Sequence, residues 1–84
     1  MQKRINIKKG CRVTNIVELS EDQFVGYYRK HYIQINREEE DLFYIIVNAP
    51  CGAIDYDGYW DGPIGSTMRD AIEEALISAC IIES

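Results

Sequence analysis

The stretch STMRDAIEEALISACII, residues 66–82, decides the fold of this chain. Its apolar residues recur every three or four positions, which is the spacing of one face of an α-helix. Thr67, followed three residues later by Asp70, makes a weak capping box, and Ser66 is the rival N-cap. We therefore predict an amphipathic helix from Ser66 to Ile82 that packs one face on a core. That face holds Met68, Ala71, Ile72, Ala75, Leu76, Ala79 and Ile82, with Cys80 at its edge.

The opposite side of this predicted helix is acidic but not purely polar. It carries Asp70, Glu73, Glu74 and Ser78, together with Ile77 and Ile81, which lie one turn apart. Two interpretations remain open. Another part of the chain covers the two isoleucines, or they form a surface ringed by carboxylates for a partner or a second copy.

Apolar residues at period-two spacing predict strands ahead of the helix. We expect one strand at residues 12–19 and one long or bent strand at residues 24–36, with Gly26 as a candidate bulge. The charge run at residues 37–41 marks the exposed tip of a hairpin that leads into a central strand at residues 42–47. The predicted fold class is α+β: a small antiparallel sheet of four to five strands with one C-terminal helix packed on one face.

The segment DYDGYWDG, residues 55–62, is the most distinctive part of the sequence. Asp57-Gly58 is a favoured pair for a type I′ turn, so we predict a short hairpin here. Its aromatic side chains either pack on the sheet or contact a partner, since exposed Tyr and Trp are frequent interface anchors. The carboxylates of Asp55, Asp57 and Asp61 also suggest a metal site, although their spacing departs from that of an EF-hand loop.

The length of 84 residues allows one domain, residues 1–84. The net charge is -5, and all 14 acidic residues lie in residues 18–84. We interpret residues 1–11 as a mobile basic arm on an acidic body. Such a body repels phosphate and attracts basic protein surfaces, so we expect a protein partner with a basic surface and no direct nucleic-acid binding. The basic residues that precede the acidic body are Lys3, Arg4, Lys8, Lys9 and Arg12.

Several protein classes are disfavoured by what the sequence lacks. No apolar run is long enough to span a bilayer, and no signal-peptide core follows the basic N-terminus, so we expect a cytoplasmic protein without membrane contact. Cys11, Cys51 and Cys80 are widely spaced, and we expect them to be reduced and mostly buried. His31 is the sole histidine and has no nucleophile placed beside it, so we expect neither an enzyme nor a cofactor.

Two features suit a ligand that contains phosphate. The six tyrosines could stack on the bases of a single strand. The turn at residues 62–67 could place backbone N–H groups around an anion. The acidic charge of residues 18–84 and the aspartates beside the turn oppose both interpretations.

From residue 32 onward the chain reads as strand, charged turn, strand ending near Pro50, loop, and then GSTMRDAIEEA at residues 65–75. This order and motif resemble the HicB antitoxin family, whose members often read Gly, acid, Thr, Leu, any residue, Glu and Ala at this point. The resemblance covers residues 32–82. It implies a degraded RNase H-like β-β-β-α unit that grips another protein without catalysis. The chain departs from the family in its short proline signature at residues 48–52, and we expect no C-terminal DNA-binding domain after Ser84.

Together these features predict a non-catalytic protein-binding module. We expect a small inhibitor or antitoxin-like protein of phage or mobile-element type, including anti-CRISPR-like inhibition, that occludes a partner's surface through its acidic face. The alternatives are a metal-dependent enzyme or calcium-binding protein centred on Asp55, Asp57 and Asp61, and a structural homodimer. The predicted partner contacts are Tyr56, Asp57, Tyr59, Trp60, Asp61, Glu73, Glu74, Ile77 and Ile81.

Overall fold

The C-terminal helix begins where its capping box predicts. The computed structural model describes residues 5–8, 11–13, 15–79 and 81. In it, α1 spans Met68–Ser78 and Thr67 is the N-cap. The Thr67 N–H donates to Asp70 Oδ2 at 2.9 Å, and the Asp70 N–H donates to Thr67 Oγ1 at 3.2 Å. The predicted capping box is therefore confirmed. Among the described helices, none has the length and apolar character needed to cross a membrane.

The helix is shorter at its C-terminal end than the sequence predicts. It ends at Ser78, and beyond it the Ile81 N–H donates to the Leu76 carbonyl at 2.9 Å. A hydrogen bond to the carbonyl five residues earlier is typical of the Schellman motif, which ends many helices. Because Ile81 leaves the helix, it packs against the core instead of continuing the outer helix face. Cys80 and Ile82 lie outside the described residues.

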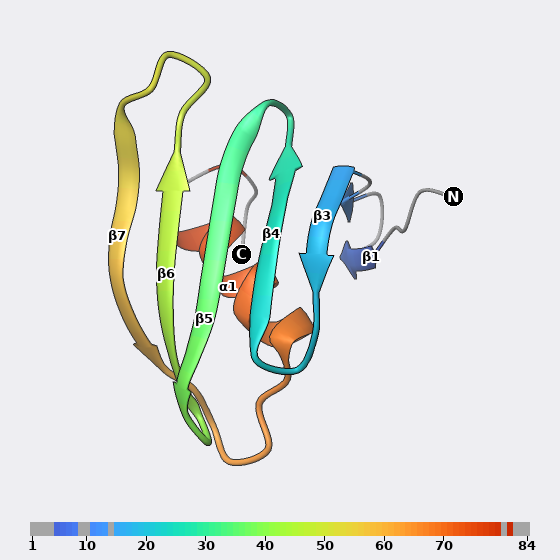
Figure 1. Ribbon diagram of the computed structural model, residues 1–84, viewed down its shortest axis with the longest axis vertical. Helices are drawn as coiled ribbons and strands as arrows, with labels where there is room; N and C mark the ends of the chain where they lie inside the picture. Colours follow the sequence, from blue (N-terminus) through green and yellow to red (C-terminus); the bar gives the residue numbers. More distant parts are fainter. Residues whose placement is uncertain (1–4, 9–10, 14, 80, 82–84) are drawn as a thin grey trace.

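Five strands form one antiparallel sheet in chain order, and α1 packs on one face of it (Figure 1). Each strand is joined to the next by a reversal of the chain. This architecture confirms the predicted α+β class with its four to five strands and one terminal helix. The strands are β3 (Asn15–Leu19), β4 (Gln23–Tyr28), β5 (His31–Glu39), β6 (Leu42–Asn48) and β7 (Ile54–Asp61).

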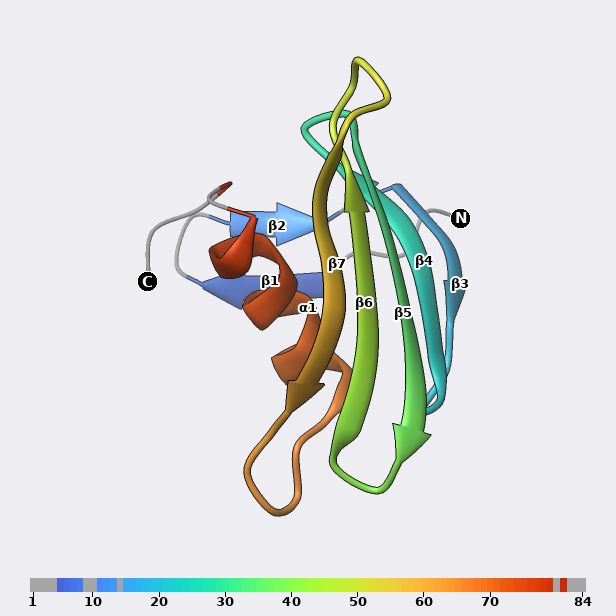
Figure 2. The same cartoon turned by 90° about the vertical axis from the view of Figure 1, so that its left-hand side faces the viewer.

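A separate two-stranded sheet lies on the same side as the helix (Figure 2). Its strands β1 (Ile5–Lys8) and β2 (Cys11–Val13) are antiparallel, and β1 contacts α1. The predicted strand at residues 12–19 is therefore divided between β2 and β3, which belong to different sheets. Within the predicted basic arm of residues 1–11, the described residues are paired in this hairpin, and the rest of the arm lies outside the described residues.

One layer of apolar side chains joins the five-stranded sheet to the helix. The sheet contributes Phe24, Tyr28, Ile33, Ile35, Phe43, Ile45 and Val47. The helix contributes five residues of its predicted apolar face: Met68, Ala71, Ile72, Ala75 and Leu76. Full burial of an Ile, Leu or Phe side chain stabilises the folded state by about 1.5–3 kcal/mol, so this layer is the main source of stability.

The predicted long strand at residues 24–36 is in fact two strands joined by a tight turn. Arg29 and Lys30 have positive φ angles of 50° and 67°, the combination that a type I′ turn requires. Neither residue is the Asn or Gly that usually signals this turn. Because the turn has two residues, paired positions on the two strands have opposite parity. Even-numbered side chains of β4 and odd-numbered side chains of β5 therefore face the helix, as Phe24 and its partner Ile35 do.

Gly26 is not the bulge that the sequence suggests. It pairs in register with β5, and the irregularity lies across from it on β3, between Ile16 and Glu18. A Cβ at Gly26 would lie 2.8 Å from the ring of Phe24 and 2.9 Å from the backbone oxygen of Asn15. The position lacks a side chain because β3 and a core ring approach it too closely.

The predicted hairpin around Asp57-Gly58 is one continuous strand, β7. It pairs along its length with β6, so that Ile45 lies opposite Gly58 and Ile46 opposite Asp57. The free energy by which Asp-Gly favours a turn is small compared with that of a full hydrogen-bonded ladder against a long apolar strand. Tertiary pairing therefore overrides the turn signal.

The reversal between β6 and β7 occurs earlier, at residues 49–53. Gly52 lies there with a φ of 93°, a left-handed conformation that glycine adopts without strain. Cys51 is exposed in this loop, so the expectation of mostly buried cysteines is wrong for it. The side chains of Cys11 and Cys80 are not among those that the structure describes.

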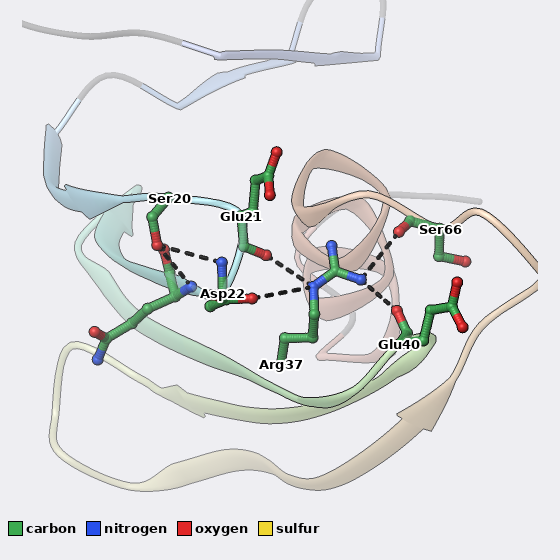
Figure 3. A network of polar contacts seen from close by, with 7 residues as sticks. Ser20, Glu21, Asp22, Arg37, Glu40 and Ser66 are labelled. Atoms are coloured by element: carbon green, nitrogen blue, oxygen red, sulfur yellow. Dashed lines mark hydrogen bonds and ion pairs between the residues drawn. The ribbon is translucent and has the colours of Figure 1, made fainter.

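The predicted exposed hairpin tip contains one residue that folds inward, Arg37 (Figure 3). Its backbone N–H donates to the carbonyl of Asp22 at 2.8 Å, and its Nε donates to the carbonyl of Glu21 at 2.9 Å. Its Nη1 donates to the carbonyl of Glu40 and reaches that of Ser66 at 3.5 Å. Arg37 therefore joins the β3–β4 turn, the β5–β6 turn and the segment before α1.

The aromatic core also contacts this arginine. Its Cζ lies 4.7 Å from the centroid of the Phe43 ring, which favours a guanidinium by cation–π attraction. The ion pair between Arg37 Nε and Asp22 Oδ1, at 3.7 Å, contributes little because the Asp22 side chain is 82% exposed. The hydrogen bonds to carbonyls and the contact with the Phe43 ring therefore provide most of the stabilisation that comes from Arg37.

Replacing Arg37 with Ala should lower the free energy of unfolding by about 1–3 kcal/mol, because three carbonyls lose a charged donor and Phe43 loses its cation. Urea unfolding followed by circular dichroism measures this change. The matched control is Asp22→Ala, which removes only the exposed ion pair and should cost less than about 0.5 kcal/mol. Equal losses in the two variants would contradict the role assigned to the carbonyl contacts.

Replacing Lys30 with Gly should raise the free energy of unfolding by about 0.5–1 kcal/mol, since glycine relieves the positive φ at this exposed turn position. The opposite change at a second positive φ, Gly52→Ala, should lower stability by a similar amount. Thermal and urea unfolding of both variants test the pair. A less stable Lys30→Gly variant would show that this turn is not type I′.

Candidate functional site

A groove of about 340 Å³ lies between α1 and the loop that precedes it. Its walls come from the end of β7, from this loop and from the outer side of α1. We name it the acidic groove and define it by three apolar residues, Trp60, Ile64 and Ile77, and three acids, Asp70, Glu73 and Glu74. It therefore combines an apolar surface with a negative rim.

The loop before α1 is held in place by its own hydrogen bonds. Asp41 accepts from the Gly62 N–H through its backbone oxygen at 2.8 Å and from the Gly65 N–H through Oδ1 at 3.1 Å. Ser66 donates to the Pro63 carbonyl through its N–H at 3.1 Å and its Oγ at 2.5 Å. Because these donors have partners within the chain, the loop does not present them to an anion as the sequence suggested.

Ile64 stands at the tip of this held loop with 97% of its surface exposed. An isoleucine in that position gains almost nothing from burial in the folded chain. Ile77, from the middle of α1, and Trp60, from the end of β7, line the groove with it. Ile64 and the exposed parts of Trp60 and Ile77 together form a small apolar surface.

Trp60 connects the groove to the core. Its ring centroid lies 5.6 Å from that of Phe43, and the residue packs against the buried cluster while staying partly exposed. A Cβ at Gly62 would lie 3.0 Å from Trp60 Cη2 and 2.4 Å from Ser66 Oγ. The indole is therefore fixed between the core and the loop, and its exposed part is a preformed wall of the groove.

The opposite face of the five-stranded sheet carries two pairs of tyrosines. Tyr27 and Tyr32 lie opposite each other on β4 and β5, with ring centroids 5.6 Å apart. Tyr44 and Tyr59 lie opposite each other on β6 and β7, at 4.8 Å. Among the described residues no helix or strand covers this side (Figure 2). We name it the tyrosine face and define it by these four residues with Ile46 and Asp57.

One hydrogen bond on this face joins a tyrosine to an acid. The Tyr44 hydroxyl donates to Asp57 Oδ1. This bond, partial burial and the negative charge of Asp57 raise the pKa of Tyr44 above its ordinary value. The ring of Tyr44 is therefore held in one orientation, and Tyr59 rests against it with 61% of its own surface exposed.

The three aspartates that suggested a metal site do not converge. Asp57 is bonded to Tyr44, whereas Asp55 Oδ2 lies 3.5 Å from His31 Nε2. The register of β7 shifts at Asp55, which separates it from Asp57, and Asp61 lies at the far end of the strand. No group of three or more His, Cys, Asp or Glu in the described part of the chain could hold a metal ion.

The structure divides the predicted partner contacts among three places. Trp60, Glu73, Glu74 and Ile77 line the acidic groove. Asp57, Tyr59 and Asp61 lie on the side of the sheet away from the helix, whereas Tyr56 and Ile81 pack against the core. The predicted single surface is therefore two surfaces on opposite sides of the sheet. The interpretation of Ile77 and Ile81 as one outer patch is wrong, because the helix ends between them.

The sequence does not single out Ile64, and it does not show which of the six tyrosines share a face of the sheet. Ile64 is one apolar residue in a turn, and only its exposure distinguishes it. Tyr27 and Tyr32 have opposite parity, so a single continuous strand places them on opposite sides. The turn at Arg29 and Lys30 brings them together in the structure, and neither residue signals this turn in the sequence.

Comparison with protein-family models, with curated proteins and with solved structures finds no match for this chain. The resemblance of residues 65–75 to the HicB family therefore stays a prediction from the motif. The chemistry of the two surfaces carries the functional argument.

Replacing Asp57 with Asn should lower the pKa of Tyr44 toward its ordinary value, because the amide keeps a hydrogen-bond acceptor but carries no negative charge. The raised pKa means that folding favours the protonated phenol. Its stabilising contribution is therefore present below the unfolded-state pKa and is lost as the pH rises through the folded-state pKa. NMR titration of ring-labelled tyrosines measures the shift. Asp61→Asn is the control, and an unchanged Tyr44 pKa in the Asp57 variant would contradict the assignment.

Proposed function

We propose that this chain is a non-catalytic protein-binding module whose acidic groove takes a basic segment of a partner protein. The observation that carries the proposal is Ile64, an apolar side chain held out on a loop that Asp41 and Ser66 fix by hydrogen bonds. A fixed loop loses little conformational freedom on binding, so burial of this side chain is available as binding free energy. Burying an isoleucine is worth about 1.5–3 kcal/mol.

The acidic rim of the groove favours a partner segment with positive charge. Asp70, Glu73 and Glu74 project from the outer side of α1, and no Lys or Arg lines the groove in the described structure. The net charge of the chain, -5, has the same sign. A basic segment is attracted during both encounter and docking, whereas a second copy or a phosphate backbone meets like charge. A basic protein segment is therefore favoured over a homodimer or a nucleic acid.

The size of the groove limits what it can hold. A volume of about 340 Å³ accommodates a few side chains rather than a folded element. The segment that fits best carries one apolar side chain, seated against Trp60, Ile64 and Ile77. Lys or Arg residues beside it then reach the carboxylates of the rim. Binding of this kind needs no catalytic group, in agreement with a non-enzymatic module.

An inhibitor or antitoxin-like role follows from the same charge argument. Basic protein surfaces commonly bind phosphate-containing ligands, and an acidic module seated on such a surface competes with them. The motif at residues 65–75, through its resemblance to the HicB family, implies a unit that grips another protein without catalysis. We therefore propose that the chain occludes a basic surface of its partner.

A photoreactive amino acid in place of Ile64 tests the proposal directly. In extract from its native cell, illumination should join the chain to a partner protein, which mass spectrometry identifies. The doubly charge-reversed variant Glu73→Lys/Glu74→Lys should abolish that adduct, because the rim no longer attracts a basic segment. The matched control places the same photoreactive group at Ile54, which is 66% exposed at the other end of β7 and away from the groove.

Purified partner then gives the energetic test. Ile64→Asp should weaken binding by at least about tenfold, which corresponds to about 1.4 kcal/mol, whereas Ile54→Asp should leave the dissociation constant unchanged. Isothermal calorimetry measures both. Equal crosslinking at residues 54 and 64, or equal affinity of the two Asp variants, would contradict the groove as the binding site.

A further inference from the structure

The tyrosine face is a surface that the acidic groove does not explain. Four aromatic rings gather there on a side of the sheet that no other described element covers. Tyr27 is 40% exposed and Tyr59 is 61% exposed. Their inner neighbours are fixed by hydrogen bonds, Tyr44 to Asp57 and Tyr32 to Gln34 Oε1 at 2.9 Å. The rings are therefore an ordered aromatic surface rather than mobile side chains.

The charged residues on the outward strand positions of this face are acidic, and the basic Arg29–Lys30 turn lies at one end, beside Tyr27 and Tyr32. Glu18 lies at the β3 edge and Asp57 and Asp61 lie on β7, on the strand positions that point away from the helix. None of those positions in the five strands of this sheet, β3 to β7, is a Lys or Arg. A second copy would bring like charges together, and a single-stranded nucleic acid would bring phosphates to them. A cationic protein segment is the ligand with complementary charge.

Aromatic faces combined with carboxylates favour arginine over lysine. A guanidinium is planar, stacks on an aromatic ring and pairs with a carboxylate through two parallel hydrogen bonds. Tyr59 and Asp57 offer both features within one region of β7, two residues apart on the same side of the strand. An ammonium group gains the charge but not the stacking.

We propose that the tyrosine face is a second docking surface, for an extended arginine-bearing segment of a partner protein, on the opposite side of the sheet from the acidic groove. The Tyr27–Tyr32 pair and the Tyr44–Tyr59 pair lie diagonally across the sheet. Strand spacing and rise put them roughly 16 Å apart. An extended segment of about five residues spans that distance. The proposal stands independently of the groove, because the two surfaces share no residue.

The test is an NMR titration of the full chain, ring-labelled at tyrosine, with three synthetic peptides of about six residues, which cover the roughly 16 Å span. They carry arginine, lysine or citrulline at both ends and Gly and Ser between. The arginine peptide should shift the ring signals of Tyr27, Tyr32, Tyr44 and Tyr59 and leave Tyr28 unchanged, since Tyr28 is in the core. It should bind about threefold to fivefold more tightly than the lysine peptide, and the citrulline peptide should not bind.

Matched variants separate this surface from the groove. Tyr59→Ser should weaken arginine-peptide binding by about fivefold or more, whereas Tyr59→Phe, which keeps the ring, should retain it. Ile64→Ser should have no effect, because it alters only the groove. Equal binding of the arginine and lysine peptides, insensitivity to Tyr59→Ser, or shifts confined to the groove would overturn the proposal. So would sedimentation that shows a dimer that Tyr59→Ser dissociates, since a second copy would then occupy the face.

Discussion

In the described part of the chain, the elements that cover the sheet all lie on one of its faces, and the rest of the structure depends on that constraint. Side chains alternate between the two faces along every strand, so burying Phe24, Ile35 and Ile45 beneath α1 commits their neighbours to the other side. The β1–β2 hairpin lies on the helix side as well (Figure 2). The uncovered face must therefore be stable in water, which suits tyrosine, because its ring packs on neighbouring strands while its hydroxyl stays hydrated.

The acidic groove depends on how the fold is closed at one end. Arg37 and Asp41 lie beside the β5–β6 turn, and both bind the segment that leads into α1. Figure 3 shows the contacts of Arg37. Arg37 reaches the Ser66 carbonyl, while Asp41 accepts from Gly65 and holds the loop that carries Ile64. A charge run that looks like a simple exposed tip is thus what positions the groove. These few polar contacts therefore link the stability of the fold to the shape of the groove.

The two wrong predictions about the strands, a turn at Asp57-Gly58 and no turn at Arg29-Lys30, share one physical origin. Turn and strand preferences act over two to four residues and are worth about 1 kcal/mol, whereas a strand ladder and its buried side chains act together over the whole sheet. Asp57-Gly58 prefers a turn locally, yet β6 offers it a full ladder of hydrogen bonds. Arg29-Lys30 has no turn signal, yet the chain must reverse there so that Phe24 and Ile35 meet beneath the helix.

The sequence by itself determined the helix, its threonine cap and its buried side, because these depend on residues three or four positions apart. It also determined the acidic charge and the α+β class, which follow from composition and from the order of elements. Only the tertiary structure decided which tyrosines share a face, because a two-residue turn reverses the alternation of side chains. It alone placed Ile64 beside Trp60 and Ile77, because that neighbourhood depends on hydrogen bonds from a turn more than twenty residues earlier in the chain.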